Sequence, residues 1–228
     1  MTFNEVLARV QWNIWGNTIS PANAVAMLGG DNGIIARAHH RIQVDHNYWF
    51  MQTWAQITSE YNEGTEEYTQ AYLLPLNIKE IINFLWRTVD DSGVATGYTK
   101  PLAQLTLEQA QQHFWPRDNN DAVEYPEYFE VVNGAIVFYP DGNCSRTGVL
   151  NYWQYIACLL GDLEDALMEA GPEAVIALAT SDMYLVLHEI ELSQLWKNRF
   201  LEECEILRTK DYHKRRAHID EFATQEGM

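Results

Sequence analysis

Histidines are the first side chains in this sequence that could do chemistry. His39 and His46 lie seven residues apart within a stretch of helical periodicity, and imidazole nitrogens are common metal ligands. Seven residues are two helical turns, about 10 Å of rise, which is too far for one ion. His188-Glu189 begins like the HExxH motif of zinc proteases, but Leu192 stands where the second histidine belongs. We therefore expect no metal site and no cofactor.

Nucleophile and phosphate-binding motifs are also missing from the sequence. It contains no GxSxG elbow, no GxxxxGK[ST] loop and no GxGxxG turn. The cysteines Cys144, Cys158 and Cys204 form no CxxC pair, so free thiols in a reducing compartment are expected. Acidic pairs such as Glu164-Asp165 and Glu202-Glu203 could bind Mg²⁺ as a nuclease does, but adjacent residues on a helix point apart. We expect a protein that is not an enzyme.

Charge and composition narrow the function classes further. The 228 residues are 47% hydrophobic and include eight Trp and twelve Tyr, which favours a folded chain with aromatic side chains in its core or at interfaces. The net charge is −17, and residues 1–196 carry all of it, because residues 197–228 hold seven basic and seven acidic side chains. Such a body should not bind a phosphate backbone, although the acidity could serve solubility alone.

The sequence predicts no signal peptide and no membrane-spanning segment. The N-terminal residues are amphipathic and interrupted by polar side chains, unlike a signal peptide. No run of about 18 apolar residues is present. We expect a soluble protein that is made inside a cell.

The elements that must position any site are helices at both ends of the chain. Thr2 and Glu5 match a capping box for a helix over residues 3–15, and Ser20-Pro21 begins a second helix. In a third helix from residue 34, four apolar residues are expected on one face: Ile35, Ala38, Ile42 and Trp49. Ser181-Asp182 should cap a long helix that ends near Leu207.

The centre of the chain predicts strands. Asn133-Gly134 lies between Tyr128–Val132 and Ala135–Tyr139, and this arrangement is typical of a β-hairpin. Thr106 caps a short helix over 105–110. Further strands are expected over residues 54–59, 68–74, 78–89 and 148–156.

Together these patterns predict an α+β protein, in which a helical bundle contains an inserted β-rich region and ends in an extended C-terminal arm. The expected boundaries are residues 1–52 for the first bundle helices, 53–157 for the β-rich insertion, 158–208 for the last bundle helices and 209–228 for the arm.

Two motifs follow one another in the middle of the sequence. The first runs from Trp54-Ala-Gln-Ile-Thr58 through Tyr72-Leu-Leu-Pro75 to Ile78-Lys-Glu-Ile81-Ile82. The second is Pro126-Glu-Tyr128-Phe129 followed by Gly134-Ala-Ile136-Val-Phe138-Tyr-Pro140. In order and spacing they resemble motifs of the head-to-tail adaptor proteins of tailed bacteriophages. The similarity spans residues 34–216, and the long segment 90–122 departs from the family pattern.

The resemblance implies a structural role in the neck of a virion that is assembled in the host cytoplasm. Such adaptors form rings, usually of twelve copies, below the portal protein; they extend the DNA channel without binding DNA specifically and offer a docking surface to tail (nozzle or tube) proteins. The arm would contact the portal through seven candidate residues: Lys210, Tyr212, His213, Lys214, Arg215, Arg216 and Phe222. Aromatic candidates for the interface between subunits are Trp49, Trp54, Trp196 and Phe200.

Two other functions stay open at this point. One is a structural component of the tail or baseplate with a similar hairpin-containing body. The other is a metal-dependent nuclease or hydrolase that uses the acidic pairs. A ring that docks onto tail protein instead of the portal would favour the first, and activity with Mg²⁺ or Mn²⁺ that is lost on mutating one carboxylate pair would favour the second.

Overall fold

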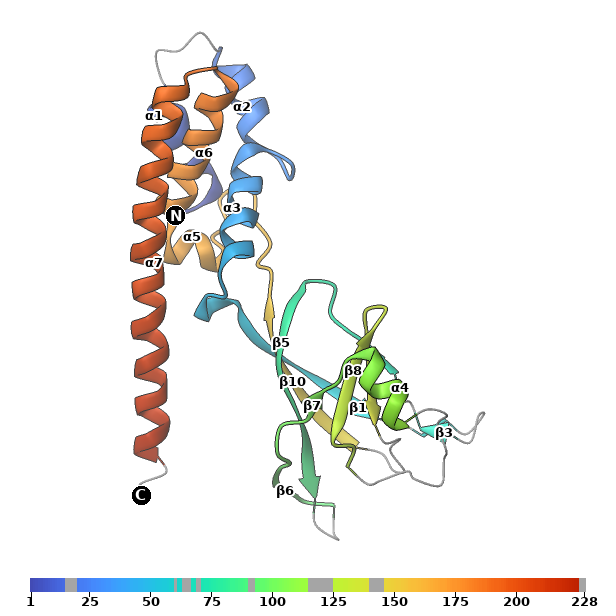
Figure 1. Cartoon of the computed structure of the whole chain (residues 1–228). Coiled ribbons are helices and arrows are strands. Elements are labelled where there is room, and N and C mark those ends of the chain that lie inside the picture. Colours follow the sequence, from blue (N-terminus) through green and yellow to red (C-terminus); the bar gives the residue numbers. More distant parts are fainter. Residues whose placement is uncertain are drawn as a thin grey trace. The chain divides into compact units, whose positions relative to one another are not determined.

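The computed structural model shows an α+β protein, as predicted (Figure 1). It describes residues 1–14, 20–59, 61–62, 67–68, 71–89, 93–114, 125–139 and 146–225. The chain forms two compact units: a helical unit of Met1–Met51 with Tyr155–Met228, and a β unit of Gln52–Gln154. In the part of the chain that is described, no helix is both long enough and apolar enough to span a membrane.

The helical unit begins with three short helices. The predicted capping box is confirmed, because the Thr2 hydroxyl accepts from the Glu5 N–H and the Glu5 carboxylate accepts from the Thr2 N–H. Ser20 caps the second helix as predicted. Trp49 was expected on the face of the third helix, but that helix ends earlier and Trp49 belongs to a 3₁₀ turn. The elements are α1 (Phe3–Asn13), α2 (Pro21–Leu28), α3 (Ile34–Asp45) and η1 (Trp49–Met51).

The second part of the helical unit contains α5 (Ala166–Ala170), α6 (Pro172–Val186) and α7 (Ile190–Gln225). The prediction that Ser181-Asp182 begins a helix is wrong. Ser181 lies inside α6, where its buried hydroxyl donates to the Ser193 carbonyl at 2.9 Å. Helix α6 is buried along most of its length and forms the centre of the unit.

The turn between α6 and α7 explains this error. The Glu189 N–H bonds the Tyr184 carbonyl and the His188 N–H bonds the Leu185 carbonyl, which is the hydrogen-bond pattern of a Schellman C-cap. His188 occupies the left-handed position of that cap with φ 63°. Glycine or asparagine usually marks this position in a sequence, and here neither is present.

Helix α7 is much longer than the helix it packs against. Gly171, just before α6, lies beside Leu207, whereas Ser181 meets Ser193 near the other end, so α6 and α7 are antiparallel. About 18 residues of α7 therefore extend beyond α6, roughly 27 Å at 1.5 Å per residue, and Figure 1 shows this extension. The predicted helix end near Leu207 is wrong, since residues 209–225 of the arm continue α7.

The side chains of α7 that face the helical unit recur at steps of three, four and four residues. An eleven-residue repeat corresponds to 3.67 residues per turn, close to the natural period of an α-helix. One face can therefore stay in contact with the unit over six turns with little supercoiling. The buried or half-buried members are Ser193, Trp196, Phe200, Cys204, Leu207, Asp211 and Arg215.

The β unit contains two four-stranded sheets. The first has the order β1-β10-β5-β6 and is antiparallel throughout. The second has the order β4-β9-β8-β7, and its hairpin at Asn133-Gly134 is confirmed. A separate two-stranded pair joins β2 (Tyr61–Asn62) to β3 (Glu67–Tyr68). The remaining elements are β1 (Gln52–Ser59), β4 (Ala71–Leu73), β5 (Ile78–Val89), β6 (Ala95–Tyr98), β7 (Ala103–Gln104), α4 (Leu107–Phe114), β8 (Tyr128–Val132), β9 (Ala135–Tyr139) and β10 (Arg146–Gln154).

The first and last strands of the β unit pair with one another. Gln52 lies opposite Trp153 in the register of β1 and β10, and the pairing continues to Ser59 opposite Arg146. The unit therefore begins and ends on neighbouring strands, at adjacent positions.

One aromatic core holds the two sheets together. The rings of Phe84 and Trp86 from the first sheet meet the ring of Phe138 from the second, with centroids 4.7–4.8 Å apart. The buried Trp86 indole donates to the Pro126 carbonyl at 3.1 Å, which satisfies its N–H inside an apolar environment. Gly148 lies directly over Phe84, where a Cβ atom would come within 2.1 Å of the ring.

Replacing Gly148 with alanine should destabilise the β unit, because neither the strand backbone nor the enclosed Phe84 ring has room to move. We expect a loss of about 1–3 kcal/mol of unfolding free energy, the usual cost of overpacking a core. Urea unfolding followed by tryptophan fluorescence measures it. Gln56→Ala, at an exposed position of β1, is the matched control and should change stability by less than about 0.5 kcal/mol. Equal stability of Gly148→Ala and wild type would contradict the close contact.

Candidate functional site

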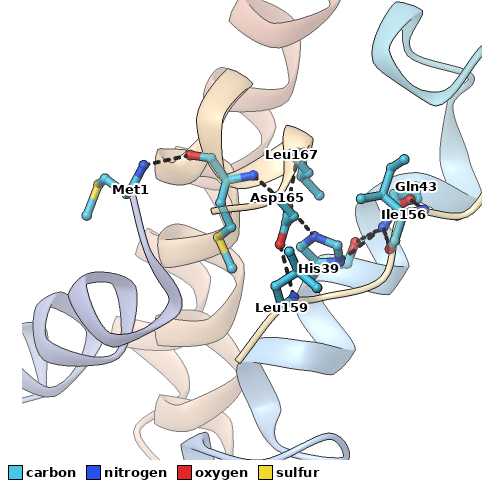
Figure 2. A network of polar contacts seen from close by, with 8 residues as sticks. Met1, His39, Gln43, Ile156, Leu159, Asp165 and Leu167 are labelled. Atoms are coloured by element: carbon cyan, nitrogen blue, oxygen red, sulfur yellow. Dashed lines mark hydrogen bonds and ion pairs between the residues drawn. The ribbon is translucent and has the colours of Figure 1, made fainter. Parts of the chain in front are cut away.

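A buried hydrogen-bond network connects α3 to α5 and to the segment before α5 (Figure 2). The His39 imidazole Nε2 lies 2.9 Å from Asp165 Oδ1, and both side chains are almost fully buried. Asp165 is the N-cap of α5, and its Oδ1 also accepts from the N–H groups of Leu167 and Met168. Its other oxygen faces the Leu159 N–H at 3.4 Å. One carboxylate therefore joins α3, the segment before α5 and α5 itself.

Gln43 extends the network by one helical turn. Its side-chain amide pairs with the backbone of Ile156 in both directions: the Ile156 N–H donates to Oε1 at 2.6 Å, and Nε2 donates to the Ile156 carbonyl at 3.0 Å. Nε2 also lies 3.0 Å from His39 Nδ1. Because an amide nitrogen is a donor, Nδ1 is the acceptor of this pair and Nε2 carries the imidazole proton that faces Asp165. Gln43 thus holds both the ring of His39 and the chain that returns from the β unit.

The network also brings Cys158 near His39 and Asp165, with one potential ligand atom of each lying within 4.8 Å of the others. Burial opposes ionisation of Asp165, but its hydrogen bonds to His39 and to backbone N–H groups outweigh this, so the pKa of Asp165 lies below its ordinary value of 3.8. Burial, followed by the charges of Asp165 and Asp31, raises the pKa of the Cys158 thiol to about 12. The cluster therefore contains a carboxylate and a neutral thiol at pH 7.

The hydrogen bonds of this cluster are made within the protein, and its thiol is not activated as a nucleophile. Both nitrogens of His39 and both oxygens of Asp165 already have hydrogen-bond partners. A nucleophilic cysteine needs a thiolate, whereas burial raises the pKa of the Cys158 thiol to about 12. The arrangement fits a structural role, in which buried polar groups are all satisfied and fix the packing of three segments.

The sequence gives no sign that His39, Cys158 and Asp165 lie together, and it favours Glu164-Asp165 as a pair of solvent-exposed carboxylates. In the structure Asp165 is buried and Glu164 is exposed. The available signal was local: an aspartate immediately before an apolar helical run is a typical N-cap. Its approach to His39, 126 residues away in the sequence, carries no local signal.

A second buried carboxylate, Asp211, attaches the distal part of α7 to the turn after α3. Asp211 Oδ1 accepts from the Trp49 N–H at 2.5 Å, and Oδ2 lies 3.2 Å from His46 Nε2. The same oxygen is 2.9 Å from Arg215 Nε, and the Arg215 guanidinium also donates to the Asn47 carbonyl. The beginning of the predicted arm is therefore folded against the helical unit.

The portal-contact candidates differ in their surroundings. Tyr212, His213 and Arg216 are exposed, and the Tyr212 and His213 rings meet edge to face. Lys214 Nζ lies 5.6 Å from the centroid of the Trp49 ring. Lys210 Nζ is 3.4 Å from the Ala170 carbonyl.

Phe222 lies in α7, with its side chain outside the described residues, and Arg215 takes part in the Asp211 cluster. Among the aromatic candidates, Trp49 and Trp54 are 41% and 65% exposed. Trp196 is half-buried beneath the Arg199 guanidinium. Phe200 is buried inside the helical unit and contributes to its core. Cys144 lies outside the described residues.

Comparison with models of known protein families finds no match for this chain. Comparison with curated proteins finds none either.

Asp165→Asn should destabilise the protein at neutral pH by about 1–3 kcal/mol, because the amide replaces an acceptor oxygen with a donor beside buried N–H groups. The contribution of ionised Asp165 is present above its unfolded pKa and is lost as pH falls through the lower pKa of the folded state. The difference from wild type should thus be full at pH 6–7 and shrink only below about pH 4. Urea unfolding at several pH values measures it, with Glu169→Gln as an exposed control.

Asp211→Ala should release the distal part of α7. His46, the Trp49 N–H and Arg215 all lose one partner, so opening of this contact should become easier by about 2–3 kcal/mol. Hydrogen exchange of peptides covering residues 46–51 and 208–216 should quicken, while α6 stays protected. Tyr212→Ala, at the exposed neighbouring position, is the control. Unchanged exchange in Asp211→Ala would mean that this contact does not hold the helix.

Proposed function

We propose that this chain is a structural head-to-tail adaptor of a tailed-phage virion, which forms a ring below the portal. The observation that carries the proposal is the arrangement of the last helix. Helix α7 continues well past α6, and the basic residues 210–216 lie in the part that extends beyond α6. The motif resemblance implies a helical bundle with a β-rich extension and a C-terminal arm, and the end of α7 occupies the position of that arm.

The electrostatics support contact with a protein partner at this end. The bases Lys210, Lys214 and Arg216 lie on α7, with Asp211 between them buried and paired. The carboxylate charge of Asp211 is therefore paired inside the protein, and the three basic side chains around it are exposed. Exposed charges of this kind direct the rate and orientation of association more than its affinity. An acidic groove on the portal would be complementary.

The acidic remainder of the chain suits a channel component. The net charge of −17 falls on residues 1–196, and affinity for DNA arises mostly where Lys and Arg neutralise phosphates. A wall of this charge would let DNA pass without holding it. The exposed rings of Trp49 and Trp54 are of the residue type that is enriched at subunit interfaces. We propose them as contacts between copies in the ring.

A binding assay with the portal protein of the same virus tests the proposal. The variant Lys210→Gln/Lys214→Gln/Arg216→Gln removes three exposed charges but keeps the buried Asp211 and its partner Arg215, so α7 should stay folded against the unit. We expect it to bind at least about tenfold more slowly at low salt, with a smaller effect at high salt. A matched variant, Lys79→Gln/Lys100→Gln in the β unit, should bind like wild type.

Electron microscopy of the mixture gives the second measurement. Rings on the portal are expected with the wild-type chain. Absence of binding to the portal would overturn the adaptor role, and rings that dock only onto tail protein would indicate a tail component. Equal association rates for the arm variant and wild type would show that the basic segment is not the portal contact.

A further inference from the structure

The first sheet of the β unit has two edges, and within the described residues no strand pairs with either of them. Its strand order is β1-β10-β5-β6, so β1 and β6 are the outer strands. An edge strand presents a row of unpaired N–H and C=O groups, which can pair with a strand of another molecule. Each edge of this sheet is therefore a site where a further strand can add.

Alternate residues of β1 direct their backbone groups to the open edge. The Trp86 carbonyl on β5 accepts from the Thr99 N–H at 2.8 Å, on the side of β6. In an antiparallel ladder the two residues of a pair either face each other or both face away, so Gly148, opposite Trp86, directs its N–H and C=O toward β1. Gly148 also lies opposite Ile57, which is therefore bonded to β10. The N–H and C=O of Gln56 point the other way.

This open edge extends along most of β1, and the strand carries none of the usual protection. By the same alternation, four residues face outward: Gln52, Trp54, Gln56 and Thr58. Their backbone groups have no other partner in the part of the chain that is described. Edge strands are commonly protected by charged side chains, proline or a bulge. The sequence of β1 has no charge and no proline, and its register with β10 continues without a bulge.

The edge of β6 is complementary to the edge of β1. Three antiparallel pairings separate the two strands, so β1 and β6 run in opposite directions. A second copy placed beside the first without being turned over therefore presents β6 antiparallel to β1. Tyr98 lies opposite Arg87, the residue after Trp86, so the backbone groups of Tyr98 face outward. The two edges of the sheet can thus bond to each other in successive copies.

Two exposed aromatic rings lie on the same face of the sheet at these edges. Trp54 and Tyr98 are 65% and 59% exposed. Ala55 packs against the aromatic core, so its neighbour Trp54 points to the opposite face. Tyr98 pairs with Arg87, the neighbour of the core residue Trp86, and points to that same face. Pairing of β1 with β6 of another copy would place both rings on one surface, where aromatic cross-strand contacts are favourable.

The distribution of charge favours a second copy as the partner. The chain has a net charge of −17, so two copies repel one another over most of their surfaces. Neither β1 nor β6 contains a charged residue, so the two strands can meet without bringing carboxylates together. A basic partner would instead gain from acidic side chains at the contact. An uncharged edge on an acidic protein therefore suits a partner of the same acidity.

We propose that β1 of one copy pairs with β6 of the next copy, so that the first sheets of neighbouring copies form one continuous antiparallel sheet. Because the two edges differ, the contact is heterologous, and its repetition about an axis can close a ring. The inference rests on the proposed adaptor function and specifies which strands join the subunits of the ring. Since β6 has only four residues, we expect extensive pairing only where copies are held side by side.

Disulfide trapping between copies tests this assignment. Full-length chains carrying Gln56→Cys and Tyr98→Cys are mixed in oxidised glutathione, both on the portal of the same virus and alone at about 1 mM. Paired residues of adjacent strands lie within disulfide distance. Trp54→Cys replaces Gln56→Cys in a second mixture, because a register shift of two residues keeps the same face. Peptide mass spectrometry should find a cross-link to position 98 at a yield at least about tenfold above that of Gln104→Cys, an exposed residue of the second sheet.

The variant Gln56→Pro tests the backbone bonds directly. Proline is tolerated in an edge strand where the N–H faces solvent, so the β unit should stay folded. Deuterium uptake over residues 52–59 should fall when wild-type copies assemble on the portal and should not fall for Gln56→Pro. Uptake over 146–154 is the internal control, because β10 is already paired on both sides. If Gln56→Pro does not fold, the cysteine mixtures still decide the question.

The outcomes separate this inference from the adaptor function. Portal-bound copies without a cross-link above the control would overturn the strand pairing and leave the adaptor role intact. A disulfide formed by Gln56→Cys chains alone would mean that β1 pairs with itself and would exclude β6. Protection of residues 52–59 that requires tail protein would assign the edge to that partner instead. If the chain does not bind the portal, the adaptor role fails, and the concentrated mixture alone supports the pairing by its cross-link or overturns it by the lack of one.

Discussion

The carboxylate of Asp165 lies where three segments of the helical unit meet, and the packing of the unit depends on its being ionised and fully bonded. It accepts from His39 on α3 and from N–H groups at the start of α5, and through His39 it connects to Gln43 and the backbone of Ile156. A buried charge is costly unless its partners replace water. Here the partners come from distant segments, so the charge is satisfied only when those segments are correctly placed. Asp165 therefore specifies one arrangement of the unit more than it adds net stability.

Asp211 fixes the position of α7 in the same way, because its buried carboxylate also needs partners from another segment. The apolar side chains at Phe200, Cys204 and Leu207 would let the helix slide or fray beyond α6, whereas a buried carboxylate that needs the Trp49 N–H and His46 fixes its register. Burial also raises the pKa of the Cys204 thiol to about 11. Cys204 is therefore neutral and packs as an apolar side chain of α7. The proposed contact surface of Lys210, Lys214 and Arg216 therefore surrounds a residue, Asp211, that is bonded to the helical unit.

Sequence patterns predicted the elements well where the signal is local. The capping box at Thr2 and Glu5, the hairpin at Asn133-Gly134 and the strand over 78–89 follow from hydrogen bonds and periodicity within a few residues. The α+β class follows from the same patterns. The helix boundary between α6 and α7 was predicted wrongly because His188 adopts the left-handed conformation that glycine or asparagine usually adopts at a helix end.

The candidate sites were predicted less completely, because they depend on contacts between distant residues. His39 meets Asp165 across 126 positions, and Asp211 reaches Trp49 across 162. The sequence does contain a signal for Asp211. It lies four residues after Leu207 and so continues the apolar stripe of the helix, where a polar residue implies a buried partner.

The pairing of Gln52 with Trp153 has a consequence for how the chain folds. For the helical unit, the β unit is a loop of about 100 residues, and closing such a flexible loop costs conformational entropy that grows with the logarithm of its length. Once β1 and β10 have paired, the ends of the loop are already neighbours, and the remaining closure resembles that of a short turn. Formation of the β sheet should therefore precede and accelerate assembly of the helices on either side of it. Lengthening the loops inside the β unit should have little effect on the stability of the helical unit.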